Sequence, residues 1–261
     1  MVVSERGLER LGPPRPDSVA LPRRRHADMT DPQPCRQQVG DFGFWPRTQS
    51  GQKFLRKTEA RLALRGLDLW WVDGNHDDLQ SLQSRAIQAD GRRRTSDHIW
   101  HLPRGHRWTW GDSVWIAAGG AVSVDRYGRT EAVSWFRDEE LTDLEVDQMI
   151  EEGAADVVVS HDAPWGAGIL GRRLSLDLPP TERASWWPDD LLGLSDLHMQ
   201  RVRRLVDGVG ATLVFHGHHH VRYTDRLETA HGSIQVTGLA HDLSPIDQVC
   251  VLVGQDGQPI S

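Results

Sequence analysis

Three apolar runs in this chain end in residues of the types that commonly bind metal ions, namely Asp, Asn and His. They are LDLWWVDGNHDD (67–78), ADVVVSHDAPWG (155–166) and ATLVFHGHHHVR (211–222), and QQVGDFGFWP (37–46) has the same form with a single carboxylate. An apolar run that stops in Asp, Asn or His is typical of a buried β-strand. Its last residues then lie at the carboxyl edge of a sheet, where α/β proteins build their sites. The sequence therefore predicts strands that bring distant side chains to one place.

The segments between these runs predict helices and further strands. GQKFLRKTEARLALRG (51–66) has apolar residues among charges and ends in glycine, which predicts a helix with a C-terminal stop. RDEELTDLEVDQMIEEG (137–153) has an acidic first turn and an apolar stripe, and a third helix is expected near 196–207. Short strands in 98–136 are expected to form a second sheet, and three more are expected in the tail. This order predicts an α/β fold with mixed sheets.

Residues 1–36 differ from the rest of the chain. They are rich in proline, contain an arginine run and have no sustained period of 2 or 3.6, which predicts an irregular leader. From residue 37 onward the sequence has the alternation of apolar and polar segments that is typical of a globular domain. We therefore expect one domain over 37–254.

Composition narrows the class of protein. The formal net charge of −7 argues against a general nucleic-acid binder, which needs surplus Lys and Arg. Two cysteines, Cys35 and Cys250, are too few for a disulfide framework and point to the reducing cytoplasm. The sequence offers neither the roughly 18 consecutive apolar residues of a membrane helix nor the apolar region of a secretory signal. We expect a cytoplasmic protein without membrane contact, and the oligomeric state stays open.

GNHD at 74–77 is the sharpest single motif. Gly74 permits a tight turn, Asn75 offers a neutral amide oxygen to a metal, and His76 can move a proton near neutral pH. Asp77 is expected to orient the His76 imidazole or to cap the next helix at its N-terminus. For the isolated motif, an ordinary turn followed by an N-cap is the alternative interpretation.

GHHH at 217–220 is a second cluster of possible ligands. If the chain stays extended, His218 and His220 lie on the same side and His219 points the other way. His161 in SHDAP and Asp41 in GDFG are weaker signals, since each has a common structural explanation when taken singly.

Combined, the motifs supply one carboxylate, one amide and two imidazoles. These four side chains belong to Asp41, Asn75, His161 and His218. The mixture of nitrogen and oxygen donors favours a divalent ion such as Mn, Fe, Zn, Ni or Co. The absence of thiolates argues against a structural zinc site of the cysteine type.

The motifs GDFG, GNHD, SHDAP and GHHH resemble, in the same order, four motifs of the calcineurin-like metallophosphoesterase superfamily. The flanking sequence is similar to a bacterial and phage branch of that superfamily, and the resemblance covers most of the chain after residue 37. It implies a four-layer α/β/β/α sandwich of two mixed sheets. It also implies a metal-dependent phosphoesterase that acts on a small phosphorylated substrate through two metal ions.

The resemblance also implies a role for each matching side chain. Asp41 would bridge two ions, with Asn75, His161 and His218 completing one of them. His220 would serve the other ion. His76 would protonate the leaving-group oxygen or stabilise the phosphoryl group during transfer.

One motif of the superfamily, Asp-x-His at the end of a first strand, is missing. The nearest candidates, His26 and Asp28, stand in reverse order and too close to Asp41 for a strand and a crossover helix. We therefore expect the first strand and helix to be absent or replaced and the second metal site to lack ligands. A catalytically impaired pseudo-phosphoesterase that binds one metal or none is the alternative function. A nuclease is a third, which the acidic net charge disfavours.

Further residues are candidates for contact with the substrate. Arg104, Asp125, Arg126 and Arg129 either contact phosphate oxygens or form ordinary ion pairs and loop anchors. The Trp-rich insertion at 165–187 is where a substrate lid would fit.

Overall fold

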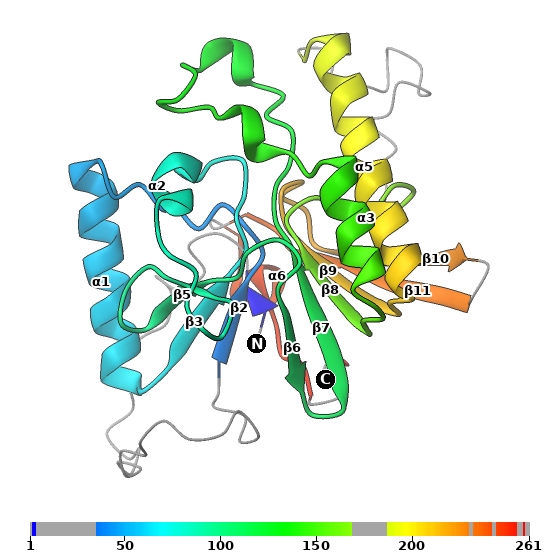
Figure 1. Cartoon of the computed structure of the whole chain (residues 1–261), viewed down its shortest axis with the longest axis horizontal. Coiled ribbons are helices and arrows are strands. Elements are labelled where there is room, and N and C mark those ends of the chain that lie inside the picture. Colours follow the sequence, from blue (N-terminus) through cyan, green and yellow to red (C-terminus); the bar gives the residue numbers. More distant parts are fainter. Residues whose placement is uncertain are drawn as a thin grey trace.

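Two β-sheets face each other, and helices cover the outer side of each sheet (Figure 1). The computed structural model describes residues 2–3, 35–168, 187–229, 232–241, 244–254 and 258. Both sheets have six strands in this part of the chain and contain parallel and antiparallel pairs. The expected α/β/β/α sandwich of two mixed sheets is confirmed.

The first sheet has the strand order β12-β1-β2-β3-β5-β4. Its members are β1 (Val2–Val3), β2 (Cys35–Gln38), β3 (Asp68–Trp71), β4 (Arg93–Arg94), β5 (Ile99–His101) and β12 (Cys250–Val251). The four strands from β1 to β5 in this order run parallel, and β12 and β4 are antiparallel at the two edges. The prediction that all strands of 98–136 belong to the second sheet was wrong for β5, which pairs with β3.

The second sheet has the strand order β10-β11-β9-β8-β7-β6. Its members are β6 (Arg107–Trp110), β7 (Ser113–Ala118), β8 (Val157–Ser160), β9 (Leu213–His216), β10 (Tyr223–Thr229) and β11 (Gly232–Gly238). The inner strands are parallel, and β6 and β10 are antiparallel to their neighbours. Parallel inner strands point their carboxyl ends to the same edge, which is the geometry that a shared site needs.

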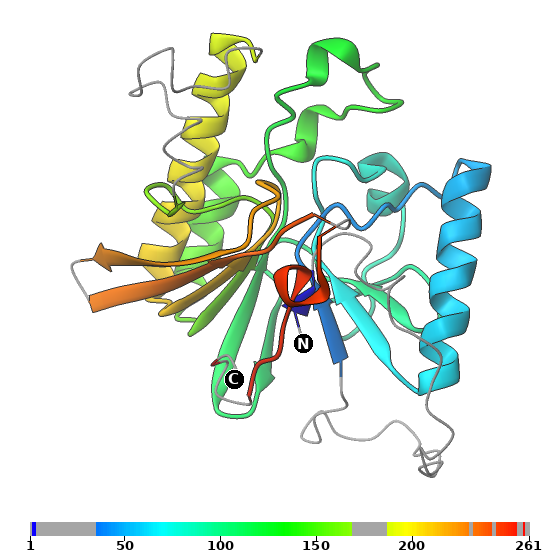
Figure 2. The same ribbon diagram turned by 180° about the vertical axis from the view of Figure 1, so that it is seen from behind.

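The long helices form the two outer layers of the sandwich (Figure 1 and Figure 2). The long ones are α1 (Gln49–Arg65), α3 (Asp143–Glu151) and α5 (Asp189–Val209), and the short ones are α2 (Leu79–Gln83) and α6 (Ile246–Val249). Figure 2 shows α1 beside the first sheet, and α3 and α5 together beside the second. The helix predicted for 51–66 is confirmed as α1, which ends at a left-handed Gly66.

The start of α3 differs from the sequence prediction. Residues Arg137–Glu139 form a separate 3₁₀ turn, and α3 begins after Thr142. The Thr142 side chain accepts from the backbone of Glu145, while the Glu145 side chain accepts from the backbone of Thr142. This capping box defines the helix start more strongly than the acidic residues before it.

The strands alternate their side chains between two apolar layers. In β7 and β8, Trp115 and Val157 face the other sheet, whereas Ile116 and Val158 pack with the residues of α3 and α5. Trp115 stacks on Phe215 with ring centroids 6.1 Å apart. Because most side chains of the inner strands are apolar on both faces, each sheet packs against the other sheet on one face and against helices on the other.

The predicted leader begins with a strand. Val2–Val3 pairs in parallel with β2 and antiparallel with β12, so a two-residue strand stands where the first strand was expected to be absent or replaced. The sequence continues with Ser4, Glu5 and Arg6 and has no Asp-x-His there. The remainder of the leader, residues 4–34, lies outside the described residues. Among the helices that are described, none is long and apolar enough to cross a bilayer.

Candidate metal centre

Four of the predicted ligands follow four different strands. Asp41 follows β2 and Asn75 follows β3 in the first sheet, while His161 follows β8 and His218 follows β9 in the second. Asp41, Asn75 and His161 are 4% exposed or less. The sandwich thus brings side chains from both sheets to one buried position, as the strand-end pattern predicts.

The distances between these side chains fit a single divalent ion. His161 Nε2 lies 3.2 Å from Asp41 Oδ2 and 3.0 Å from Asn75 Oδ1. The ligand atoms of Asp41, His161 and His218 lie within 4.8 Å of one another. Two donors that are each about 2.1 Å from a metal and at right angles to one another are about 3 Å apart. Asp41, His161 and His218 therefore form a group that can hold a metal ion, with Asn75 beside it.

The hydrogen bonding of His161 shows that this position suits a cation. His161 Nδ1 lies 2.7 Å from the carbonyl oxygen of Val39, which can only accept, so Nδ1 carries a hydrogen. In the neutral ring, the lone pair of Nε2 then faces the oxygens of Asp41 and Asn75. Three electron-rich atoms this close together are stable only around a positive charge.

The pKa of His161 reflects the same arrangement. Burial lowers this pKa, but the Asp41 carboxylate and the hydrogen bonds to Asp41 and Val39 outweigh burial and raise it to about 9. A proton on Nε2 and a metal ion would therefore occupy the same place between the ligands.

Asn75 is fixed by side chains that the motif did not reveal. Its Nδ2 donates to Ser123 Oγ at 3.1 Å, and Ser123 Oγ donates to Glu139 Oε2 at 2.8 Å. Glu139 also accepts from Ser123 N and from Trp135 Nε1. Because the Ser123 hydroxyl gives its hydrogen to Glu139, it can only accept from Asn75, and Asn75 Oδ1 is left facing His161.

The Asp41 loop has a close contact with the GNHD turn. Asp41 has a left-handed φ of 54°, and its Oδ1 accepts from His76 N at 2.7 Å. A Cβ at Gly74 would lie 2.1 Å from Asp41 Oδ1, so only glycine fits there. The glycine of the motif is needed for this approach as well as for the turn.

Asp77 holds the same loop in place. Its carboxylate accepts from the backbone amides of Phe42, Gly43, Phe44 and Gly74, at distances between 2.9 and 3.3 Å. Burial and the nearby Asp41 raise the pKa of Asp77 to about 7. The cap of α2 is Asp78, whose side chain accepts from Ser81 N. The expected capping role of Asp77 was wrong, because its carboxylate is turned toward the Asp41 loop.

His76 is exposed beside the centre and contacts Arg129. Arg129 Nη2 donates to His76 Nδ1, and Arg129 Nη1 donates to Asn75 O and Ser123 Oγ. A guanidinium only donates, so Nδ1 is the acceptor and the hydrogen of the neutral imidazole is on Nε2. The His76 ring is therefore oriented by Arg129, and the expected orientation by Asp77 is not what the structure shows.

The GHHH turn is not extended. His218 and His220 have left-handed φ angles of 59° and 61°, so the period-2 argument does not apply. His218 lies next to His161, with ring centroids 5.0 Å apart. His219 Nε2 lies 2.9 Å from Asp162 Oδ1, and Asp162 Oδ2 lies 2.7 Å from His198 Nδ1 of α5. The pairing of His219 with Asp162 ties the His218 turn to the residue that follows His161.

His220 does not belong to the group of closely spaced ligand atoms, although it is near enough to Asp41 and His161 for their charges to affect its pKa. It is exposed, and its ring centroid is 5.8 Å from that of His241. Within the described residues, the group of closely spaced ligand atoms contains Asp41, His161 and His218 but not His220. The geometry of one metal position is thus more complete than that of a second.

Arg104 is a structural residue. Its Nε and Nη2 donate to Asp73 Oδ2 at 3.0 and 2.9 Å, and its remaining N–H groups reach the carbonyls of residues 138–140. Asp73 also contacts His101, and Arg104 and His101 keep the pKa of this buried carboxyl below its usual range. Of the two roles expected for Arg104, phosphate contact and loop anchor, the structure shows the loop anchor. Arg129 is the arginine that contacts His76.

The sequence interpretation missed several residues that support the centre. These are Ser123, Glu139, Asp162, His198 and His219. Asp162 and His219 are sequence neighbours of His161 and His218, so proximity to a motif was an available signal. No sequence signal pointed to Ser123 and Glu139, because the hydrogen bonds that link them to Asn75 depend on the tertiary fold. The expected lid falls largely on residues 169–186, outside the described residues.

No protein-family model matches this chain, and no curated protein matches it in sequence. Among solved structures, it is similar to the crystal structure of TT1561 of Thermus thermophilus, with 12% identity, a TM-score of 0.44, and 79% of this chain and 76% of that chain covered. It is also similar to phosphopantetheinyl hydrolase (PptH) from Mycobacterium tuberculosis, with 14% identity, a TM-score of 0.35, and 80% and 79% covered. With TM-scores this low, neither neighbour assigns an activity to this chain.

Proposed function

We propose that this chain is a metal-dependent phosphoesterase of the calcineurin-like type that hydrolyses a phosphomonoester or phosphodiester of a small molecule. The observation that supports it best is the position of His161 Nε2, which lies 3.2 Å from Asp41 Oδ2 and 3.0 Å from Asn75 Oδ1, with His218 beside them. Mn, Fe, Zn, Ni or Co suits such a set of nitrogen and oxygen donors. The low cysteine count fits a cytoplasmic location.

The protein's own groups have distinct tasks in this proposal. The chemistry that a divalent ion supplies here, when bound, is polarisation of the phosphoryl oxygens. His76 presents Nε2–H to a phosphoryl or leaving-group oxygen, because Arg129 occupies its Nδ1. That tautomer favours hydrogen bonding to the transferring group over a full proton transfer. Ser123 and Glu139 keep the Asn75 oxygen directed toward the centre.

The test is metal-dependent hydrolysis of p-nitrophenyl phosphate and bis(p-nitrophenyl) phosphate by protein loaded with Mn²⁺. Asp41→Ala should abolish both turnover and metal binding, since Asp41 is the carboxylate of the ligand group. Asp97→Ala is the matched control, because Asp97 is exposed on the surface in an ion pair with Arg94. Absence of hydrolysis with either substrate at full metal occupancy would overturn the proposal.

A pseudo-phosphoesterase with one metal ion is the second candidate. Two observations favour it: His220 stands outside the ligand group, and Ser4-Glu5-Arg6 follows β1 where the superfamily has Asp-x-His. The two candidates differ in stoichiometry. Elemental analysis of purified protein that finds two ions per chain favours the dinuclear enzyme, and one ion without turnover favours the pseudo-enzyme.

A further inference from the structure

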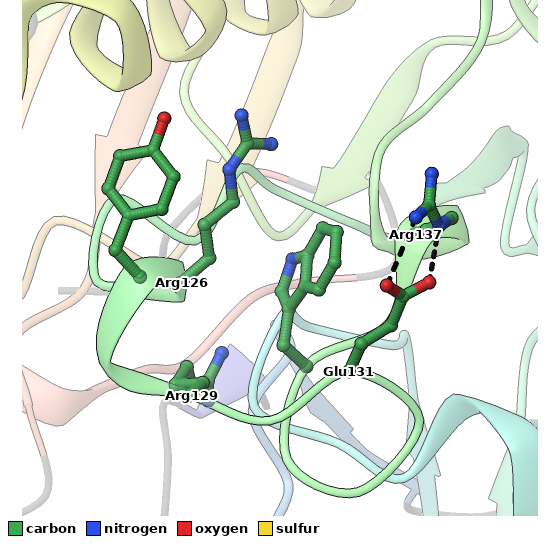
Figure 3. A pocket seen from close by; sticks show the side chains of 6 residues that line it. Arg126, Arg129, Glu131 and Arg137 are labelled. Carbon is green, nitrogen blue, oxygen red and sulfur yellow. Dashed lines mark hydrogen bonds and ion pairs between the residues drawn. The ribbon is translucent and has the colours of Figure 1, made fainter.

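An open pocket lies beside His76, formed by the segment that follows Ser123. It has a volume of about 490 Å³, and Figure 3 shows its lining side chains. The lining residues are Arg126, Tyr127, Arg129, Glu131, Trp135 and Arg137. We call it the arginine pocket. The ligand group of the metal centre has no member in common with this lining, so the pocket is a separate surface.

The arginine pocket is positively charged on an acidic protein. Three arginines and one glutamate line it, whereas the whole chain has a formal net charge of −7. Glu131 offsets the charge of Arg137, with which it makes two contacts. The other two arginines also have a carboxylate nearby, because Asp125 lies 3.6 Å from Arg129 and Glu140 lies 3.9 Å from Arg126. The guanidinium groups that line the pocket attract anions.

Arg129 connects the pocket to the centre. One of its nitrogens donates to His76 and another donates to Asn75 O, while the residue also lines the pocket. Trp135, on the same wall, donates to Glu139, which holds Ser123. A phosphoester whose phosphoryl group lies at the ligand group and contacts His76 therefore has this pocket next to it.

Arg126 is the pocket arginine whose guanidinium lies against two aromatic rings, with the carboxylates of Glu140 and Asp190 nearby. Its guanidinium lies 5.8 Å from the Tyr127 ring centroid and 5.6 Å from that of Trp135. Its ion pair with Glu140 is 3.9 Å long, which exceeds hydrogen-bond distance. Tyr127 is itself held by Asp190 at the start of α5. The two rings fix the guanidinium in the pocket while leaving it able to donate to a ligand.

We propose that the arginine pocket binds the leaving group of the substrate and selects leaving groups that carry a second phosphate, with Arg126 as the residue that determines this specificity. The proposal rests on the proposed phosphoesterase function. A guanidinium matches two oxygens of a phosphate in a way that an ammonium does not. The preferred substrate is thus an alcohol with two phosphates, one hydrolysed at the centre and one held by Arg126.

The first experiment measures binding without turnover. AMP and adenosine are titrated calorimetrically into metal-free protein in EDTA, so that a phosphate cannot coordinate a metal. AMP should bind more tightly than adenosine, and Arg126→Ala should weaken AMP binding about 10-fold or more, the usual size of a lost charged hydrogen bond. Arg126→Lys should restore part of it. Arg226→Ala, which removes an exposed arginine outside the pocket, should change nothing.

The second experiment compares two substrates that differ by one phosphate. The kcat/KM for adenosine 3′,5′-bisphosphate should exceed that for adenosine 3′-monophosphate, and Arg126→Ala should remove most of this preference. Equal AMP affinity in wild type and Arg126→Ala would overturn the pocket assignment. So would loss of AMP binding in Asp41→Ala, since AMP would then sit at the ligand group. If no substrate is hydrolysed but AMP binding depends on Arg126, the pocket stands and the phosphoesterase function fails.

Discussion

The carboxylate of Glu139 accepts the hydrogen of the Ser123 hydroxyl at 2.8 Å, and this contact decides which way the Asn75 amide faces. Burial raises the pKa of Glu139 to about 7, although the hydrogen bonds from Ser123 and Trp135 act in the opposite direction. A carboxylate is kept in a buried place, where its charge is costly, because it supplies the acceptors that Ser123 needs.

Glu139→Gln tests this role. A glutamine amide has one accepting oxygen in place of two, so it cannot accept from Ser123 Oγ, Ser123 N and Trp135 Nε1 together. We expect Mn²⁺ affinity to fall about 10- to 100-fold, as is usual when a residue that orients a ligand is lost. Metal titration by calorimetry measures it, with Glu151→Gln on the exposed side of α3 as control. Unchanged affinity would mean that Ser123 alone orients Asn75.

Gly74→Ala should displace Asp41. The added Cβ would lie 2.1 Å from Asp41 Oδ1 and 2.3 Å from Asp41 N, which forces the loop to move. We expect metal binding to be lost or weakened at least about 10-fold, together with a lower melting temperature. Gly128→Ala is the matched control, since its Cβ would meet nothing within 4 Å. Full metal affinity in Gly74→Ala would show that the Asp41 position is not critical.

His76→Ala should separate turnover from metal binding. His76 is exposed and lies outside the ligand group, so the number of bound ions should not change. Turnover should fall by roughly 10²- to 10³-fold, the usual size of the loss when one hydrogen-bond donor to the transition state is removed. The measurements are kcat and elemental analysis on the same preparation. His98→Ala, at a histidine that pairs with Asp68 away from the centre, should leave kcat near the wild-type value.

The stability of the protein should depend on pH through His106. Burial and the charge of Arg92 lower the pKa of His106 to about 4 from an ordinary value of 6.5. Between these values the unfolded state binds more protons than the folded state, so the free energy of unfolding rises from pH 4 to 6.5 and levels off above. Urea unfolding of wild type and His106→Gln at about pH 4.5 and about pH 7 measures this. The difference between the two pH values should be smaller in the variant, and an equal difference would contradict the prediction.

The strand ends were readable from the sequence because a buried parallel strand leaves a continuous apolar run. Asn75, His161 and His218 each follow such a run, whereas Asp41 follows the more polar strand β2, and the structure brings all four together. The direction of the His218 side chain was not readable. His218 and His220 have left-handed φ angles, a conformation that non-glycine residues seldom adopt and that the sequence pattern therefore did not predict.

At the starts of α3 and α2, neighbouring residues gave conflicting sequence signals for where the helix begins. The Thr142–Glu145 capping box was present in the sequence, yet the acidic run before it suggested an earlier start for α3. In the DD pair after His76, either aspartate suits an N-cap, and the choice of Asp78 follows from the engagement of Asp77 by the Asp41 loop. The residue that caps α2 depends on which aspartate forms hydrogen bonds with a segment distant in the sequence. It therefore cannot be predicted from a single sequence.

The ligand group and its neighbour Asn75 join one sheet, through Asp41 and Asn75, to the other, through His161 and His218. An ion bound there would act as a crosslink between the two halves of the sandwich. Its occupancy would raise resistance to heat and denaturant, by about 2.7 kcal/mol when the free ion is at about 100 times its dissociation constant. Melting curves recorded over a series of metal concentrations would then rank candidate ions without any substrate being known.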